Sequence, residues 1–165
     1  MTGGVLVIGI GNAFRGDDGL GVWAARELRR RSLPGVTVVE CSGEGAEVFE
    51  LLRTGTHVLL IDAVNAGTGE GTVVRIDCHT SAVPHSLFRS SSHTFGVAEA
   101  IALARVLGEV PETLVLHGIE GSHFLAGTGL SDTAVRSMPH LLAGIERDCA
   151  LMRSGTFTES DGVYT

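Results

Sequence analysis

The strongest constraint on the fold of this 165-residue sequence is an alternation of short apolar runs with longer segments of helical periodicity. The short runs are rich in Val, Ile and Leu, which is typical of strands buried on both faces of a parallel sheet. The alternation predicts an α/β fold with three layers, an α/β/α sandwich around a mostly parallel, five-stranded sheet. The expected strands are residues 4–10, 36–40, 57–62, 72–77 and 113–119, and the expected helices are residues 18–31, 44–52, 94–107 and 131–152.

The connection between the third and fourth predicted strands makes the sheet mixed. Its sequence at residues 65–69 is Asn-Ala-Gly-Thr-Gly, which is rich in turn formers and too short for a helical crossover. We therefore expect the fourth strand to pair antiparallel with the third. In the last predicted helix, Ser131 is expected to be the N-cap, and Pro139 is expected to break or kink the helix near its first turns.

The domain organisation is simple, because no internal repeat and no domain linker is visible. We expect a single domain at residues 1–152, followed by a mobile tail at residues 153–165. Residues 78–92 fit neither a strand nor a helix, because they are polar and contain Pro84 and a run of serines. A long loop inside a compact domain is more often functional than idle, so this loop is a candidate functional segment.

Charge and cysteine content exclude several classes of protein. All 12 basic residues are arginine against 19 acidic residues, so lysine chemistry is excluded and the net charge of −7 argues against nucleic-acid binding. The run of arginines at residues 29–31 is expected to complement the end of a helix. Three cysteines, Cys41, Cys78 and Cys149, form no CxxC pair and fit a reducing cytoplasm. The apolar runs are far shorter than the roughly 20 residues that cross a bilayer, so we expect a cytoplasmic monomer without a membrane partner.

The loop after the first predicted strand resembles a nucleotide-binding turn only in part. Gly9-x-Gly11 suggests a dinucleotide fingerprint, and Glu40 imitates the acidic residue that binds the ribose. However, Phe14 occupies the position where a Rossmann turn needs a small residue. A nucleotide-binding module is therefore kept only as a disfavoured alternative.

The same loop carries two consecutive carboxylates, Asp17 and Asp18, at the start of a predicted helix. Asp17 would be favourable there as the N-cap, and Asp18 as a partner of the helix dipole. Consecutive helical residues point about 100° apart, so only one of the two is expected to face a cleft. Asp62 follows the third apolar run, and His93 precedes the helix that begins near residue 94.

These side chains gather at one edge of the predicted sheet, the edge where open α/β sheets bind ligands. Two carboxylates and an imidazole form a plausible set of oxygen and nitrogen ligands for a divalent metal such as zinc or nickel. The spacing contains no HExxH, which excludes a zincin-type helix. A serine nucleophile at residues 90–92 would lack the G-x-S-x-G elbow. Other histidines are weaker candidates as ligands, namely His79, His85, His117 and His123.

Five segments, in order from residue 4 to residue 150, resemble the hydrogenase maturation endopeptidases, which process the large subunit of nickel-iron hydrogenases. The first is Val-Leu-Val-Ile-Gly-Ile-Gly-Asn followed by Asp-Asp-Gly-Leu-Gly at residues 17–21. The next two are Leu-Ile-Asp-Ala at residues 60–63 and the segment that begins Ser-His at residues 92–93. The last two are Leu-Val-Leu-His-Gly-Ile-Glu at residues 114–120 and Gly-Thr-Gly-Leu-Ser at residues 127–131.

The resemblance implies a phosphorylase/hydrolase-like fold and a cytoplasmic peptidase that removes a short C-terminal extension from the large-subunit precursor after nickel insertion. It implies that Asp18, Asp62 and His93 are both the metal-binding and the catalytic residues, with Asp17 as the alternative to Asp18 if the register slips by one. No resident cofactor is implied, because the nickel would belong to the substrate and act as a recognition element.

One loop departs from the family pattern. The family often has an Asp-Gly-Gly-Thr type sequence after the second strand, a loop associated with substrate choice, whereas this chain has Glu-Cys-Ser-Gly-Glu-Gly at residues 40–45. The resemblance therefore does not indicate which hydrogenase is served. Two further alternatives are a non-catalytic chaperone that binds nickel or the precursor, and an endopeptidase like the spore proteases of the same fold.

Overall fold

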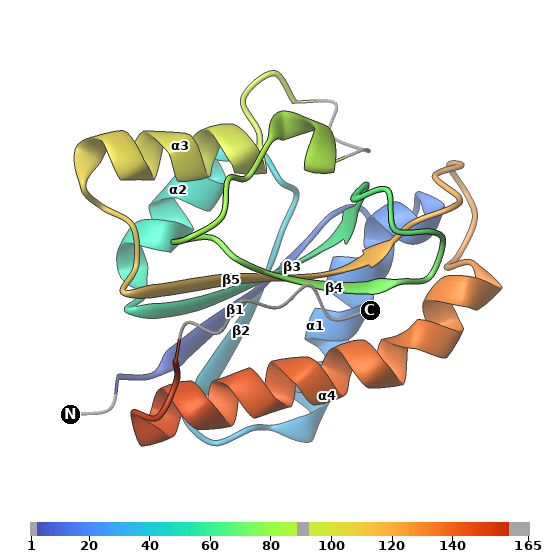
Figure 1. The fold of residues 1–165 in the computed structure, drawn as a ribbon. Helices are drawn as coiled ribbons and strands as arrows, with labels where there is room; N and C mark the ends of the chain where they lie inside the picture. The colour runs from blue at the N-terminus through green and yellow to red at the C-terminus, as the bar shows by residue number, and fades with distance from the viewer. Residues whose placement is uncertain (1–2, 89–92, 159–165) are drawn as a thin grey trace.

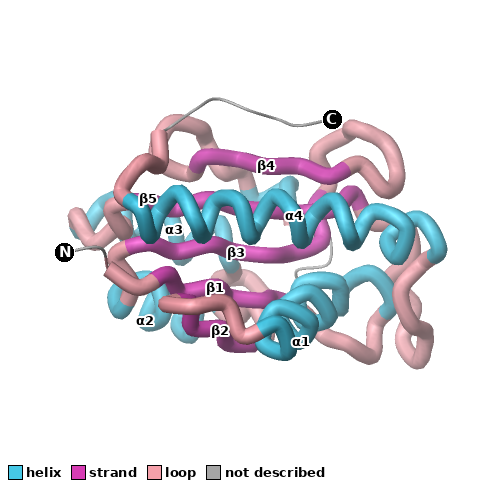
Figure 2. The backbone as a smooth tube through the Cα atoms, turned by 90° about the horizontal axis from the view of Figure 1, so that it is seen from below, coloured by secondary structure: helices cyan, strands magenta, loops and turns pink. Residues whose placement is uncertain are grey.

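The structure is a computed structural model that describes residues 3–88 and 93–158. Its five strands form one sheet in the order β2-β1-β3-β5-β4 (Figures 1 and 2). Helices α1 and α4 cover one face of the sheet and helices α2 and α3 cover the other, which confirms the three-layer α/β/α sandwich (Figure 1). The strands are β1 (Val5–Ile10), β2 (Val36–Cys41), β3 (His57–Val64), β4 (Val73–Asp77) and β5 (Thr113–Glu120). The helices are α1 (Leu20–Arg31), α2 (Gly45–Thr54), α3 (Val97–Leu107) and α4 (Asp132–Ser154), with short 3-10 turns η1 (Gly16–Gly19) and η2 (His85–Leu87).

The sheet is mixed as expected, but the neighbour of β4 was predicted wrongly. β4 pairs antiparallel with β5, and β5 pairs parallel with β3, so β5 lies between the two strands that were expected to pair. The connection at residues 65–72 crosses the end of β5 and is held there by Glu120, whose side chain accepts the backbone N–H groups of Ala66 (2.6 Å) and Gly67 (3.3 Å). The connection is therefore long enough to step over one strand, which a tight hairpin could not do.

The start of the first helix and the effect of Pro139 in the last helix differ from the prediction. The first helix was expected to begin at Asp18, but residues 16–19 form a 3-10 turn and the α-helix begins at Leu20. Ser131 is the N-cap of α4 as predicted, because its side chain accepts the backbone N–H of Ala134 (3.2 Å). Pro139 lies inside α4 without breaking it, since the carbonyl that would lose its hydrogen bond belongs to the exposed residue Val135.

Glycines allow α1 to lie directly against the sheet. A Cβ atom added at Gly9 of β1 would stand 2.3 Å from the carbonyl oxygen of Gly21 in α1, and a Cβ at Gly21 would stand 2.3 Å from the carbonyl oxygen of Ile61 in β3. Both distances are too short for any side chain. This close approach fixes the turn that precedes α1 against the carboxyl ends of β1 and β3.

A buried ionic cluster joins the edge strand β4 to α4. Asp148 of α4 accepts hydrogen bonds from Arg75 Nε of β4 (2.8 Å) and from His117 Nε2 of β5 (2.8 Å), and all three side chains are buried. Burial alone would raise the pKa of Asp148, but the hydrogen bonds from His117 and Arg75 lower it below the ordinary value. The cluster therefore holds an ionised carboxylate between the sheet and the helix.

All three cysteines are buried, free thiols. Burial raises the pKa of Cys41, Cys78 and Cys149 to about 12 in each case. After α4, the chain turns back on itself, because Thr156 and Phe157 both donate backbone hydrogen bonds to the carbonyl of Leu151 (3.0 and 3.1 Å). The rest of the tail that was expected to be mobile, residues 159–165, lies outside the described residues. In the ranges that the structure describes, no helix is both long and apolar enough to span a membrane.

Candidate functional site

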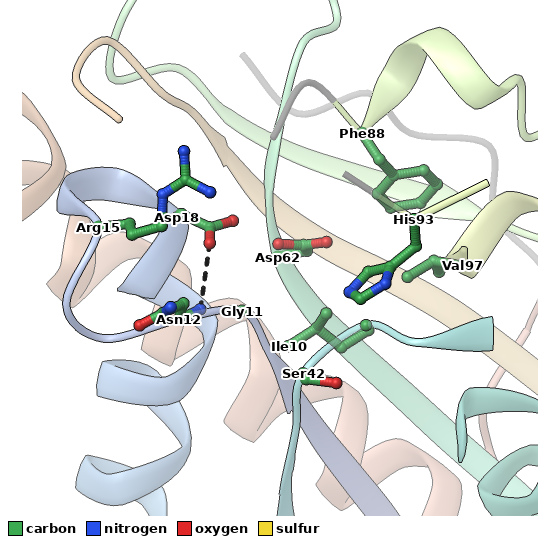
Figure 3. Close-up of a pocket in the computed structure, with 11 residues that line it drawn as sticks. Ile10, Gly11, Asn12, Arg15, Asp18, Ser42, Asp62, Phe88, His93 and Val97 are labelled. Atoms are coloured by element: carbon green, nitrogen blue, oxygen red, sulfur yellow. Dashed lines mark hydrogen bonds between the residues drawn. The ribbon is translucent and has the colours of Figure 1, made fainter. Parts of the chain in front are cut away.

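Asp18, Asp62 and His93 line one cavity of about 290 Å³ at the carboxyl ends of the strands. The three side chains come from separate segments, namely the turn η1, the strand β3 and the segment that leads into α3, and they face the same space (Figure 3). Over residues 3–88 and 93–158, no three Asp, Glu, His or Cys side chains are grouped closely enough to hold one metal ion. The predicted residues therefore share a cavity without forming a closed coordination site.

Asp62 is the most deeply placed carboxylate of this cavity. It is 5% exposed, and its Oδ1 accepts the backbone N–H of Ala63 (2.8 Å). Burial, and then the negative charge of Asp18, raise the pKa of Asp62 well above its ordinary value. The cavity therefore disfavours the ionised form of Asp62 relative to a carboxyl group in water.

Asp18 is positioned by the glycine-rich loop after β1. The backbone N–H of Asn12 donates both to Asp18 Oδ2 (3.2 Å) and to the Asp18 carbonyl oxygen (3.2 Å). Gly11 has a φ of +133°, and a Cβ atom there would stand 1.8 Å from that same carbonyl oxygen. Only glycine fits at this position, so Gly11 serves the placement of Asp18.

The acidic residue that imitated a ribose ligand is engaged elsewhere. Glu40 forms ion pairs with Arg26 (3.1 Å) and Arg29 (2.9 Å) of α1, so it joins β2 to α1. Hydrogen bonds from Arg29 and Arg26 lower the pKa of Glu40, although burial opposes them. Gly11 and Glu40, which suggested a nucleotide-binding turn, therefore both have structural roles that need no nucleotide.

Asp17 does not line the cavity, although it precedes Asp18 in sequence. Its Oδ2 accepts the backbone N–H groups of Ser122 (2.8 Å) and His123 (3.2 Å) and the hydroxyl of Ser131 (2.8 Å), and its Oδ1 accepts the backbone N–H of Ser131 (2.8 Å). Burial alone would raise its pKa, but these hydrogen bonds lower the pKa of Asp17 below the ordinary value. Nor does Asp17 cap the following helix, whose N-cap is Gly19.

Three of the four other candidate histidines, His79, His85 and His117, have side-chain partners outside this cavity. His117 belongs to the buried cluster with Asp148, and His85 contacts Glu99 (2.5 Å). A ring nitrogen of His79 contacts the carbonyl oxygen of Pro111. Residues 90–92, which include the serines considered as nucleophiles, lie outside the described residues.

Several residues of the cavity were not singled out from the sequence. Arg15 is the most notable, because it brings a positive charge to the wall that Asp18 also forms (Figure 3). Its position in the loop directly after β1 is a signal that could have identified it, since that loop lies at the ligand-binding edge of the sheet. Ser42 and Gly43 belong to the loop associated with substrate choice, and Phe88 belongs to the candidate functional segment at residues 78–92. The lining residues that had no assigned role are Ile10, Asn12 and Val97.

An open polar cavity at the carboxyl ends of parallel strands defines an α/β domain that binds its ligand at the sheet edge. The sequence pattern of the hydrogenase maturation proteases matches residues 22–148. The chain belongs to the hydrogenase maturation protease family.

Individual relatives agree with this assignment. The hydrogenase expression/formation protein HupD of Thiocapsa roseopersicina is 32% identical over 120 residues, which cover 70% of this chain and 53% of that protein. The hydrogenase 2 maturation protease of Escherichia coli is 29% identical over 134 residues, which cover 78% of this chain and 80% of that protein. The structure of the hydrogenase maturating endopeptidase HybD from E. coli has the same fold, with a TM-score of 0.73, 23% identity and coverage of 92% of this chain and 94% of that one. The chain spans little more than half the length of the first of these relatives.

Proposed function

We propose that this protein is an endopeptidase that removes a C-terminal extension from the nickel-loaded large-subunit precursor of a nickel-iron hydrogenase. The observation that carries the proposal is the convergence of Asp18, Asp62 and His93 on one cavity in a chain of the hydrogenase maturation protease family. In this proposal the nickel is part of the substrate, so the protein needs no resident metal, and the three side chains recognise the metal where it is already bound.

The chemistry of the three side chains supports this role. Carboxylate oxygens and an imidazole nitrogen form a mixed donor set that nickel and zinc accept. The side chains belong to three segments, so they can approach a metal that a partner protein presents without closing around it. A partial coordination set suits an ion that already has ligands in the precursor.

Recognition of the nickel would make cleavage depend on loading, because only a loaded precursor brings a divalent ion to the carboxylates of the cavity. A precursor without nickel would face a cavity in which burial and the charge of Asp18 raise the pKa of Asp62 and nothing offsets them. An approaching divalent ion would favour the ionised form of Asp62. Nickel would thus fix the precursor, place the scissile peptide near the cavity and make cleavage conditional on correct loading.

The test is incubation of purified protein with nickel-loaded and nickel-free precursor, followed by mass measurement of the large subunit. We expect shortening of the loaded precursor only. A protein that binds the loaded precursor but never shortens it would be a non-catalytic chaperone instead. Equal cleavage of both precursors would favour an endopeptidase of the spore-protease kind.

Single substitutions test the assigned residues. We expect Asp18→Ala, Asp62→Ala and His93→Ala each to abolish processing while the circular dichroism spectrum is unchanged. Asp132→Ala is the matched control, because Asp132 is an exposed carboxylate outside the cavity. Processing by all three cavity variants at the control rate would refute the assignment. Light scattering of the purified protein tests the accompanying expectation that it is a monomer.

A further inference from the structure

Two loops beside the candidate cavity are joined into one surface, which we call the two-loop platform and which comprises residues 12–18 and 121–131. Three backbone hydrogen bonds cross between the loops. Gly16 N–H donates to the Thr128 carbonyl (2.9 Å), Asp17 N–H to the His123 carbonyl (2.6 Å), and Gly127 N–H to the Phe14 carbonyl (2.7 Å). The loops are therefore one structural unit, although more than 100 residues separate them in sequence.

Inward-facing groups supply the stability of this platform. The carboxylate of Asp17 gathers the backbone N–H groups at both ends of the second loop, at Ser122 and Ser131. Phe124 and Leu130 pack against the hydrophobic core on the α4 side of the sheet. These contacts hold the two loops together without any contribution from the outward-facing side chains.

Two large apolar side chains nevertheless face outward from the platform, because Phe14 is 79% exposed and Leu125 is 72% exposed. The backbone of Phe14 is fixed on both sides, since its N–H donates to Asn12 Oδ1 (2.9 Å) and its carbonyl accepts from Gly127. The carbonyl of Leu125 accepts the hydroxyl of Thr128 (2.6 Å). Exposed apolar side chains on an ordered backbone are a feature of surfaces that bind proteins.

The platform is continuous with the candidate cavity. Arg15 follows Phe14 directly and lines the cavity together with Asp18. Phe14 also borders a neighbouring hollow that shares Gly11 and Asn12 with the cavity. A cavity of about 290 Å³ lies at the small end of the range for ligand sites, so it admits only a short stretch of a protein chain. A folded protein that places such a stretch in the cavity must rest on the rim.

We propose that the two-loop platform is the docking surface for the folded body of the precursor, with Phe14 and Leu125 as its apolar anchors. This inference rests on the proposed function, because the precursor is the protein whose terminal segment enters the cavity. The matching surface on the precursor is an apolar depression beside that segment. Because the two loops are already joined in the free protein, little conformational freedom is lost when the anchors bind.

The test measures single-turnover cleavage of nickel-loaded precursor over a range of protease concentrations. We expect Phe14→Ser and Leu125→Ser each to raise the half-saturating concentration at least about tenfold, as truncation of an interface anchor does. The matched control is Val106→Ser, because Val106 is 82% exposed near the C-terminal end of α3, whereas Val97 at the opposite end lines the cavity. We expect this control to keep the wild-type half-saturating concentration, and all three variants to keep the wild-type Tm.

Two results would overturn the docking surface alone. The first is that the wild-type protein cleaves the precursor, while Phe14→Ser and Leu125→Ser have the same half-saturating concentration as Val106→Ser. The second is light scattering that finds a dimer in the wild-type protein and a monomer in the two platform variants, which would assign the surface to a second copy of this chain. A wild-type protein that neither binds nor cleaves the precursor would refute the proposed function itself, and with it this inference.

Discussion

Replacing Asp17 by asparagine tests whether one buried carboxylate holds the two-loop platform together. Both carboxylate oxygens accept backbone N–H groups, with Oδ1 bound to Ser131 and Oδ2 bound to Ser122 and His123. Asparagine has only one acceptor oxygen, so its NH2 group must face at least one of these donors in either orientation. The substitution therefore preserves the size of the side chain and removes a hydrogen bond that the structure cannot replace.

The cost follows from the number of affected bonds. The better orientation places the NH2 group against the single donor at Oδ1, Ser131 N–H, which leaves one partly buried N–H unsatisfied at a cost of about 1–3 kcal/mol. The bonds that remain at the other oxygen also lose the strength that a charged acceptor gives. We expect the free energy of unfolding to fall by about 3 kcal/mol, and the Tm to fall by roughly 6–12 °C for a chain of this size.

Urea unfolding of Asp17→Asn at pH 7 and at about pH 3 measures this effect. The folded-state pKa of Asp17 is lowered, so its contribution to stability is present above about pH 4 and is lost as the pH falls. The difference between wild type and variant should therefore shrink at the lower pH. Asp132→Asn is the control, because this exposed carboxylate in the first turn of α4 should contribute less than about 1 kcal/mol. Equal stability of the two variants at pH 7 would refute the reasoning.

Three further predictions concern the core and the cavity. Gly21→Ala should lower the urea midpoint strongly because its Cβ would overlap the sheet, whereas Gly129→Ala, with no atom within 4 Å, should not; equal midpoints would contradict the packing argument. Asp62→Asn should raise the free energy of unfolding at pH 7, because folding disfavours the ionised carboxylate of Asp62. This gain should disappear as the pH falls toward about 4, the ordinary pKa of an aspartate. A gain that persists at that pH would exclude the raised pKa of Asp62. Asp148→Ala should cost about 3–5 kcal/mol by leaving buried Arg75 without this carboxylate, and a loss below about 1 kcal/mol in urea unfolding would disprove that role.

The layers and most of the strand positions could be predicted from the sequence because burial on both faces leaves little choice of residue. The run that became β3 is apolar from Val58 to Ile61, and its parallel neighbour β1 is apolar along its whole length. The neighbour of β4 could not be predicted in the same way. It depends on Glu120, which lies far along the chain from the connection that it holds, and no local pattern carries that information.

The candidate site, like the fold, could be predicted from the sequence only in part. The sequence placed Asp62 and His93 at the ligand-binding edge, because strand ends and helix starts meet there. Helical geometry also indicated that only one of Asp17 and Asp18 would face a cleft, but not which one, and only the family resemblance favoured Asp18. The choice depends on the backbone N–H groups of Ser122 and Ser131. They donate hydrogen bonds to the carboxylate of Asp17, so Asp18 is the residue that lines the cavity. Arg15 was missed because only the carboxylates of the loop after β1 were considered as ligands, although the position of that loop at the ligand-binding edge could have identified it.

The burial of the three cysteines has a practical consequence for labelling. With a pKa of about 12, each native thiol is ionised in only about one molecule in 10⁵ at pH 7, and maleimides react with the thiolate. A single new cysteine on the surface, such as Val106→Cys, should therefore take a fluorophore while the native three stay unmodified in the folded protein. Toward maleimides the wild-type protein therefore behaves as a protein without cysteines would. Binding of a precursor can then be followed by fluorescence without replacing any core side chain.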